Sequence, residues 1–372
     1  MKNWGQSMSL KWILLEHLIE INKKAGINFI NLSEMLNLAK HTDINIQDIE
    51  EVLSFLRFQH EEGNIIFFDD LQDFIILNPK WLIDAFRCLV SDKINDTLQH
   101  RQDLTTFLRN GILSESLITE LFKSKCGNQF SDQKQNLIKV MKKFDILVEI
   151  FGEGSYIVPS MMQSLSFDTV SNCIGVAEPN CKRTSWLCLK FSFLPPAFFN
   201  HLSVWFINNY EPSKVKNDIQ SLALFRGICL FDIDKSACNK ILFTMSSDTI
   251  ALQLLSFSTG KNDFAGVCNK LRKDLIKKTN DMKKKYKLTI SYELHFKCST
   301  GHYYEDTKSY QELKMLPEFY CNQHKGSHQS ETLYLPWMMN ADEEKPQINT
   351  EQEQKNIETN SPVNLIPIFS NG

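Results

Sequence analysis

The stretch Leu53–Val90, LSFLRFQHEEGNIIFFDDLQDFIILNPKWLIDAFRCLV, most constrains what this chain can fold into. Its apolar residues recur at helical spacing as far as Phe58, and Gly63 suits the left-handed position that ends a helix. Two short apolar runs, Ile65–Phe68 and Phe74–Leu77, are typical of strands and are separated by a polar turn. The order predicts a helix followed by a two-stranded wing.

A second helix follows the wing within the same stretch. Asn78 is a favourable N-cap, and Pro79 suits the first helical position. Trp81 and Leu82 open an apolar stripe along this helix, and we interpret both as core anchors rather than as parts of a site. No residue pattern in the stretch indicates catalysis.

The same order of helix and wing occurs again further along the chain. Helices are predicted at 115–122 and Ser131–Phe144, and strands at Asp145–Phe151 and Tyr156–Pro159, with a Gly-Glu-Gly turn between the strands. The repeat lies in the order of elements and not in the residues themselves. We therefore predict a first domain, residues 8–163, built from two units that resemble winged helices.

From Ser185 onward the pattern favours strands. The predicted strands are Trp186–Phe193, Leu222–Phe231, Asn239–Ser246, Thr249–Ser256 and Leu288–Phe296. Two helices, Ala197–Asn209 and Asn262–Lys287, complete this part. The prediction is a second domain, residues 185–296, with an antiparallel sheet and helices, so the whole chain is assigned to the α+β class.

Two further segments follow the sheet domain. Residues 297–338 contain closely spaced Cys and His residues and form a predicted extension. Residues 341–372 are charged or polar over most of their length and carry few large apolar groups, so they are predicted to be a disordered tail.

Several of these segments together resemble the COR ("C-terminal of Roc") domain of Roco proteins. They are Lys11-Trp12, GNIIFFD at 63–69, IILNPKWL at 75–82, YIVPSMM at 156–162 and LPPAFF at 194–199. The resemblance covers about residues 8–296 and implies a COR-A half, 8–163, and a COR-B half, 185–296. In that family COR follows a Ras-like GTPase domain called Roc and packs against it. COR also mediates homodimerisation and couples the nucleotide state to signalling.

The sequence contains no motif of a nucleotide-binding or catalytic site. The one Gly-Lys pair, Gly260-Lys261, is followed by Asn262, and Leu255 stands where a P-loop needs its first glycine. Kinase and hydrolase signatures are also missing. We therefore expect no enzyme, and GTP would be bound only through a Roc domain in trans. The chain is expected to begin at COR with no GTPase upstream, and the alternative is a fragment of a longer GTP-binding Roco protein.

Cys and His residues gather in two clusters near the end of the chain. The clusters are His295-x-x-Cys298-x-x-x-His302 and Cys321-x-x-His324-x-x-x-His328. Thiolate and neutral imidazole suit zinc, and two ligand pairs can complete a tetrahedron. The predicted ligands of a structural zinc ion are Cys298, His302, Cys321 and His324, with His295 and His328 in reserve. The alternative is a pair of ordinary thiols beside surface histidines.

Basic residues concentrate on two predicted helices. Helix 262–287 carries nine lysines and arginines, which indicate a solvated face or else a surface for anionic lipid, nucleic acid or an acidic partner. Ser131–Phe144 carries Lys134, Lys139, Lys142 and Lys143, so a nucleic-acid-binding winged helix is the alternative function. The net charge of −3 does not favour nucleic acid as a partner.

The remaining composition points to a cytoplasmic signalling module. The chain begins without the apolar segment of a signal peptide, and no apolar run is long enough to span a bilayer. The ten cysteines follow no disulfide framework, so reduced thiols are expected. The predicted partners are a second copy of the chain and a Roc-type GTPase domain, and both follow from the family resemblance.

Overall fold

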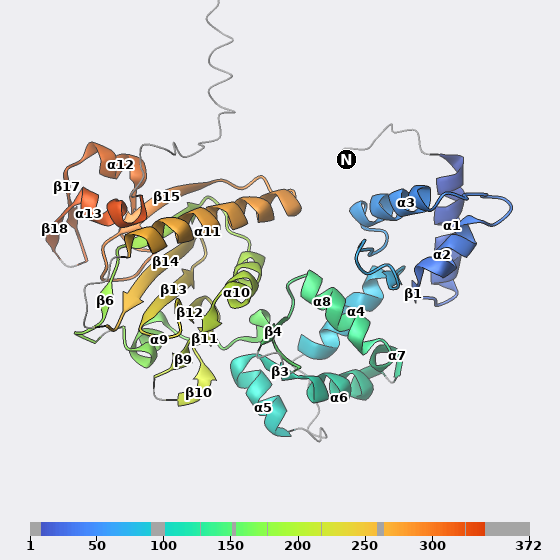
Figure 1. Ribbon diagram of the computed structural model, residues 1–372, viewed down its shortest axis with the longest axis horizontal. Helices are drawn as coiled ribbons and strands as arrows, with labels where there is room; N and C mark the ends of the chain where they lie inside the picture. Colours follow the sequence, from blue (N-terminus) through green and yellow to red (C-terminus); the bar gives the residue numbers. More distant parts are fainter. Residues whose placement is uncertain are drawn as a thin grey trace, which may run out of the picture. The chain divides into compact units, whose positions relative to one another are not determined.

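The computed structural model describes residues 9–90, 101–126, 128–150, 154–176, 178–216, 218–258, 264–323 and 325–338 (Figure 1). Helices and antiparallel strands alternate along the chain, as expected of the α+β class. The chain divides into two compact units, residues 1–177 with 195–240, and residues 178–194 with 241–372. The tail predicted at 341–372 lies outside the described residues.

The first unit opens with a small core of its own. Its elements are α1 (Leu10–Lys24), β1 (Phe29–Ile30), α2 (Leu32–Ala39), α3 (Ile49–Glu61) and β2 (Ile75–Ile76). β1 and β2 pair antiparallel, and the buried faces of the three helices meet over them. Gly63 has a φ of +82° just after α3, as its position predicted. A side chain there would be strained, which is why glycine ends this helix.

The predicted strand Ile65–Phe68 is wrong in extent. Only Ile66 pairs, through an isolated bridge to Ile76 with hydrogen bonds of 2.8 and 3.0 Å. The next amide, that of Phe67, donates instead to the His60 ring at 3.4 Å. Ile75 and Ile76 use their other edge to pair with Phe29 and Ile30, a short strand that the sequence did not reveal.

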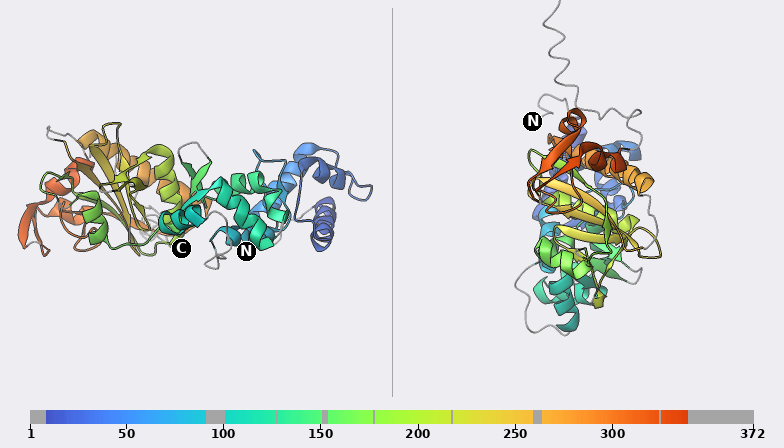
Figure 2. Two further views of the ribbon diagram at one scale, coloured as in Figure 1. Left: turned by 90° about the horizontal axis from the view of Figure 1, so that it is seen from below. Right: turned by 90° about the vertical axis from the view of Figure 1, so that its left-hand side faces the viewer.

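A second core follows in the same unit (Figure 2). Its helices are α4 (Pro79–Val90), α5 (Arg101–Asn110), α6 (Glu115–Cys126), α7 (Asn128–Ser131) and α8 (Lys134–Lys143). Its strands, β3 (Ile112–Ser114), β4 (Val148–Ile150) and β5 (Ser155–Ile157), form a sheet in the order β3-β5-β4. Helix α5 was not among the helices predicted from the sequence.

Helix α4 belongs to the second core although its sequence follows the first wing directly. The Asn78 side chain accepts a hydrogen bond from the Lys80 amide at 3.2 Å and caps the helix as predicted. Trp81 is buried, and its ring lies 5.4 Å from that of Phe29 and 5.3 Å from that of Phe130. It therefore contacts β1 on one side and α7 on the other, which confirms that it is a core anchor.

The remaining described elements of the first unit are three helices and five short strands. They are the 3-10 helix η1 (Pro159–Met161), α9 (Phe167–Ile174), α10 (Ala197–Asn209), β8 (Glu211–Pro212), β9 (Lys214–Val215), β10 (Asp218–Leu222), β11 (Leu224–Phe225) and β12 (Ile228–Asp232). α10 packs against η1 and β4, and His201 on α10 bonds to Asp145 at 2.8 Å. The single strand predicted at Leu222–Phe231 is wrong, because Gly227, with a φ of +87°, turns the chain between β11 and β12.

The second unit holds a sheet with the order β13-β14-β7-β15-β16. Its strands are β6 (Lys182–Arg183), β7 (Trp186–Phe191), β13 (Asn239–Met245), β14 (Thr249–Ser256), β15 (Tyr292–Lys297) and β16 (Lys308–Ser309). Helix α11 (Ala265–Lys285) buries Leu271, Leu275 and Met282 and leaves its lysines outside. Strand β7 pairs antiparallel with β14 and with β15, and β15 pairs antiparallel with β16, as the sequence predicted.

The extension after β15 folds back onto this sheet. It contains α12 (Tyr310–Met315), β17 (Glu318–Cys321), β18 (Gly326–Gln329), α13 (Ser330–Tyr334) and the 3-10 helix η2 (Leu335–Trp337). The fully buried Trp337 donates its indole N–H to the Ser185 carbonyl at 3.0 Å. Its own carbonyl accepts a hydrogen bond from Arg272 Nε at 3.0 Å, so the end of the extension is fixed to α11 and to the start of β7.

Candidate functional site

The Cys and His residues of the extension meet because of a hairpin register. β17 and β18 pair antiparallel, with Cys321 opposite Gly326 and Phe319 opposite His328. Residues that face each other across an antiparallel pair project to the same side of the sheet. Phe319 and Cys321 are the buried residues of β17, so His328 emerges beside them on the inner face. Cys298 follows directly after β15 and approaches this face from the main sheet.

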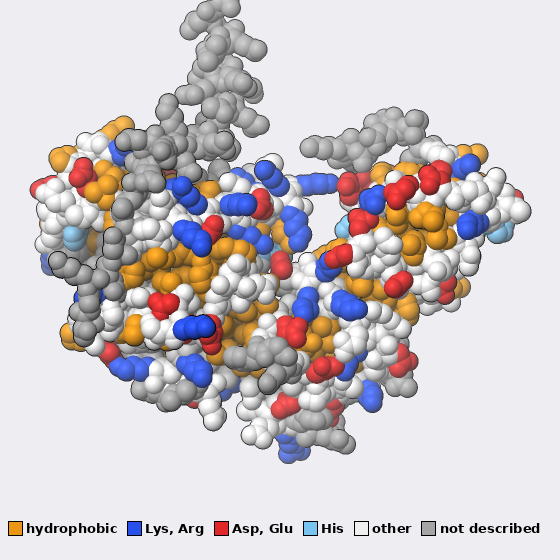
Figure 3. Space-filling model, viewed as in Figure 1, with side chains coloured by type: hydrophobic (Ala, Val, Ile, Leu, Met, Phe, Trp, Pro, Cys, Tyr) orange, Lys and Arg blue, Asp and Glu red, His pale blue; other side chains and the backbone are white. Residues whose placement is uncertain are grey.

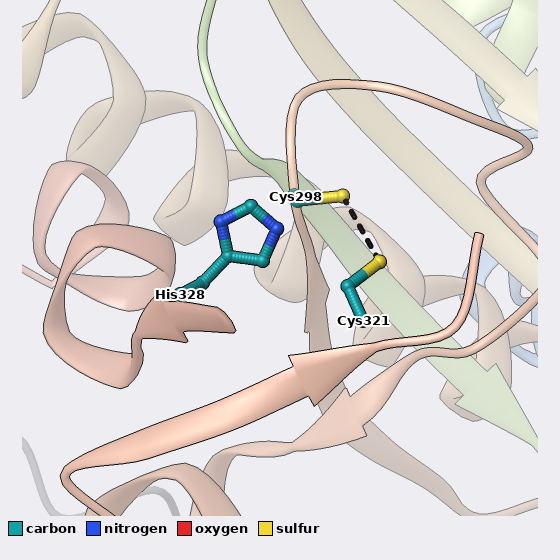
Figure 4. A group of neighbouring side chains, drawn as sticks. All are labelled: Cys298, Cys321 and His328. Atoms are coloured by element: carbon teal, nitrogen blue, oxygen red, sulfur yellow. Dashed lines mark hydrogen bonds between the residues drawn. The ribbon is translucent and has the colours of Figure 1, made fainter. Parts of the chain in front are cut away.

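Three potential metal ligands lie within reach of one ion. The Sγ atoms of Cys298 and Cys321 are 3.8 Å apart, and the ligand atoms of both cysteines and His328 all lie within 4.8 Å of one another. Both thiols are buried and His328 is half-buried. Figure 4 shows the two sulfurs side by side with the imidazole ring across from them.

Only two of the four predicted ligands lie in this group. Cys298 and Cys321 are there, whereas His302 is not among the grouped residues, and its ring lies 5.5 Å from that of Tyr304. His324 lies outside the described residues. The reserve residue His328 takes the third position instead. The sequence spacing favoured the nearer histidines, whereas the hairpin register places His328 beside the two cysteines.

The other reserve residue, His295, is engaged elsewhere. Its Nδ1 lies 3.2 Å from the Thr307 hydroxyl and its Nε2 lies 3.5 Å from a Glu293 carboxylate oxygen. Burial lowers the pKa of His295, and the Glu293 carboxylate only partly opposes that effect. His295 is therefore held neutral in the sheet edge, where it pairs with β16 across from Ser309.

The lysines that could support nucleic-acid binding are mostly committed to ion pairs. On α8, Lys134 lies 2.8 Å from Glu115, and Lys142 lies 2.5 Å from Glu149. Lys143 bonds to Asp70, which lowers the pKa of that carboxyl group. Phosphate binding needs cations that can replace released counterions. Three of the four candidate lysines already face carboxylates, so α8 offers little net charge to a nucleic acid.

Helix α11 carries a true basic stripe. Lys270, Lys273, Lys277 and Lys284 are exposed and fall on one helical face (Figure 3). Arg272 is not part of this stripe, because it is buried and its Nε–H donates to the Trp337 carbonyl. The helix thus combines a sheet-packing face with a solvated basic face.

Two fully buried thiols are kept unreactive by their apolar surroundings. Burial raises the pKa of Cys188 and of Cys229 to about 12. Since the thiolate is the nucleophile, neither side chain suits covalent catalysis at neutral pH.

We expect iodoacetamide at pH 8 to label the half-buried Cys238 at least 100-fold faster than Cys188 in the native chain. Mass spectrometry of peptides from the labelled protein measures both rates, and equal labelling would contradict the burial of Cys188.

Helix α1 presents an unusual outer face. Leu10, Ile13 and Ile21 are 70%, 50% and 48% exposed, while Leu15 and Ile19 on the opposite side are buried. At 100° per residue the three exposed residues fall within one third of the helix circumference, together with the exposed His17. We call Leu10, Ile13, His17 and Ile21 the α1 stripe. Scattered surface apolar residues are ordinary, but a contiguous stripe is typical of an interaction surface.

These features can be compared with those of known proteins. The described residues present paired helix–strand cores, a Cys/His cluster and an apolar helix face. Residues 9–162 match the family model "C-terminal of Roc, COR-A domain". The match confirms the resemblance to the COR domain of Roco proteins over these residues, which are less than half of the chain.

A solved structure of Methanosarcina barkeri Roco2, RocCORdC bound to GDP, is similar to part of the chain. The two share 22% identity over 42% of this chain and 44% of that one, with a TM-score of 0.33. This chain therefore spans less than half of that protein's length. No curated protein matches the chain. Among the described helices, none combines the length and the apolar character needed to cross a membrane.

Proposed function

We propose that this chain is a non-catalytic interaction and regulatory module of cytoplasmic signalling. It forms a homodimer and binds a Roc-type GTPase domain, on a second chain or in the same longer protein. Its two helix–strand cores act as tandem winged helices of COR-A, and the sheet unit acts as COR-B. The observation that carries the proposal is the COR-A match, which spans both cores from α1 to η1.

The α1 stripe is the surface that we assign to the Roc domain. α1 is the first element of the COR-A match, and in the family the Roc domain directly precedes COR. Apolar side chains that are half exposed or more gain the most from a partner, because each buried Å² contributes roughly 25 cal/mol. Winged-helix recognition of nucleic acid is less well supported, since the cations of α8 are paired with carboxylates.

Introducing negative charge into the α1 stripe tests this assignment. The double variant Ile13→Asp/Ile21→Asp is expected to weaken binding to a Roc-type domain roughly tenfold or more, because two carboxylates would have to be desolvated at the interface. Ile83→Asp is the matched control, since Ile83 on α4 is exposed to the same 48% as Ile21. Isothermal titration calorimetry against a panel of GDP-loaded Roc-type domains measures the affinity. Equal affinity of both variants would remove the stripe from the proposal.

A further inference from the structure

The geometry of Cys298, Cys321 and His328 goes beyond a chance meeting of polar residues. A disulfide would bring the two sulfurs to about 2.05 Å, and they stand at 3.8 Å. Two thiolates bound to one tetrahedral zinc ion, with Zn–S bonds of about 2.3 Å, lie about 3.8 Å apart. The spacing of the two sulfurs matches that of two thiolates on a shared metal ion, and it equally matches the S–H···S hydrogen bond that two thiols form without a metal.

We propose that Cys298, Cys321 and His328 bind a structural zinc ion. Two thiolates and one imidazole match the donor set of structural zinc sites, in which sulfur and nitrogen ligands form a tetrahedron. Hard cations such as Mg²⁺ and Ca²⁺ require oxygen ligands, and iron–sulfur clusters are usually held by four cysteines. Zinc is the metal that best fits this donor set. The fourth ligand that we assign is His302, the described histidine in the same segment as Cys298.

The zinc ion would fasten the start of the extension to the sheet. Cys298 directly follows β15, whereas Cys321 and His328 belong to the β17–β18 hairpin, so one ion would join parts of two separate sheets. The other end of the extension is already held, through Trp337, by Ser185 and Arg272. The metal and the tryptophan thus close the same 40-residue segment at its two ends, and the metal end is the one that depends on solution conditions.

The donors are also shielded in the way a structural site requires. Cys298 and Cys321 are 5% and 1% exposed, and Cys321 lies on the buried face of β17. A site closed by four protein ligands leaves no position for a reactive water. The ion would therefore contribute to folding and not to chemistry, and it is independent of whether a Roc domain binds.

The direct test is the metal content of the full chain, purified under reducing conditions. Inductively coupled plasma mass spectrometry is expected to find about one zinc per chain. Cys298→Ser, Cys321→Ser and His328→Ala are each expected to lower that content at least tenfold. Cys181→Ser is the matched control, because Cys181 is also buried in the second unit but lies outside the group. Its zinc content should equal that of the wild type.

The unmodified protein gives a second measurement in case a variant does not fold. A strong chelator is expected to lower the thermal midpoint of the wild type, and added zinc should restore it. Cobalt in place of zinc should produce the intense visible absorption of a tetrahedral site. A folded wild-type chain with less than a tenth of a zinc per molecule and no response to added zinc would overturn the proposal. A Cys298–Cys321 disulfide found by peptide mapping would overturn it as well.

The fourth ligand is tested by one more variant. A several-fold loss of zinc affinity in His302→Ala supports a site closed by four protein ligands. Unchanged affinity would contradict that part of the proposal. Neither result depends on binding to a GTPase, so the failure of this proposal and the failure of the proposed function can be told apart.

Discussion

Replacing Trp337 with alanine is expected to lower the free energy of unfolding by about 3–5 kcal/mol. Trp337 is fully buried, and its removal leaves a large cavity at the end of the extension. The change also leaves the Ser185 carbonyl without the indole donor at 3.0 Å. Both effects weaken the packing of η2 against the rest of the second unit. Urea unfolding, monitored by far-ultraviolet circular dichroism, measures the loss of free energy.

Leu335→Ala is the control for that variant. Leu335 lies in the same 3-10 helix but is 44% exposed, so its truncation should cost no more than about 1 kcal/mol. Limited proteolysis offers an independent readout, because a released extension should be cut between β15 and η2 in Trp337→Ala alone. Equal stability of the two variants would mean that the extension does not depend on this anchor.

Trp81→Ala is expected to have a similar effect on the first unit, about 3–5 kcal/mol. The indole contacts Phe29, Phe74 and Phe130 with ring centroids 5.4, 6.2 and 5.3 Å away. These rings come from β1, from the segment before β2 and from α7. Aromatic pairs contribute beyond the area they bury. Phe74 and Phe130 belong to the second core and Phe29 packs against it, so the loss falls on the second core of the first unit.

Ile83→Ala is the control for Trp81→Ala, since Ile83 lies on the same helix and is 48% exposed. Its expected cost is within about 0.5 kcal/mol. Hydrogen exchange should show that Trp81→Ala weakens protection in α8 and in the β1–β2 pair. Unchanged protection of α8 would contradict the role of Trp81 as an anchor of the second core.

Elements with strong periodicity could be predicted from the sequence with correct limits. The predicted helix Ala197–Asn209 and strand Thr249–Ser256 have the same ends in the structure. In the strand, every residue from Thr249 to Ser256 is buried, so a continuous apolar run was a sufficient signal. Asn78 and Pro79 likewise placed the start of α4 correctly.

Elements that depend on distant pairing were predicted less well. Ile65–Phe68 has the composition of a strand, but β2 pairs fully with Phe29–Ile30, and only Ile66 keeps a partner. Leu222–Phe231 is apolar throughout, yet Gly227 folds it into a hairpin. Local composition does not determine which strand a segment pairs with, because the packing of the whole unit decides it.

The candidate zinc site was predicted in part for a similar reason. The spacing of the cysteines identified Cys298 and Cys321, because their sequence clusters are compact. The choice among the histidines depends on the register of β17 and β18, which places His328 beside Cys321 on the inner face. A one-residue shift of that register would turn His328 to the opposite face.

The central claim is that this chain acts by binding a second copy and a Roc-type GTPase domain. Size-exclusion chromatography with multi-angle light scattering, at micromolar concentration, tests it most directly. We predict twice the mass of one chain when the protein is alone, and a further increase by the mass of the Roc-type domain when that domain is added. A particle with the mass of a single chain, unchanged by every Roc-type domain tested, would contradict the account.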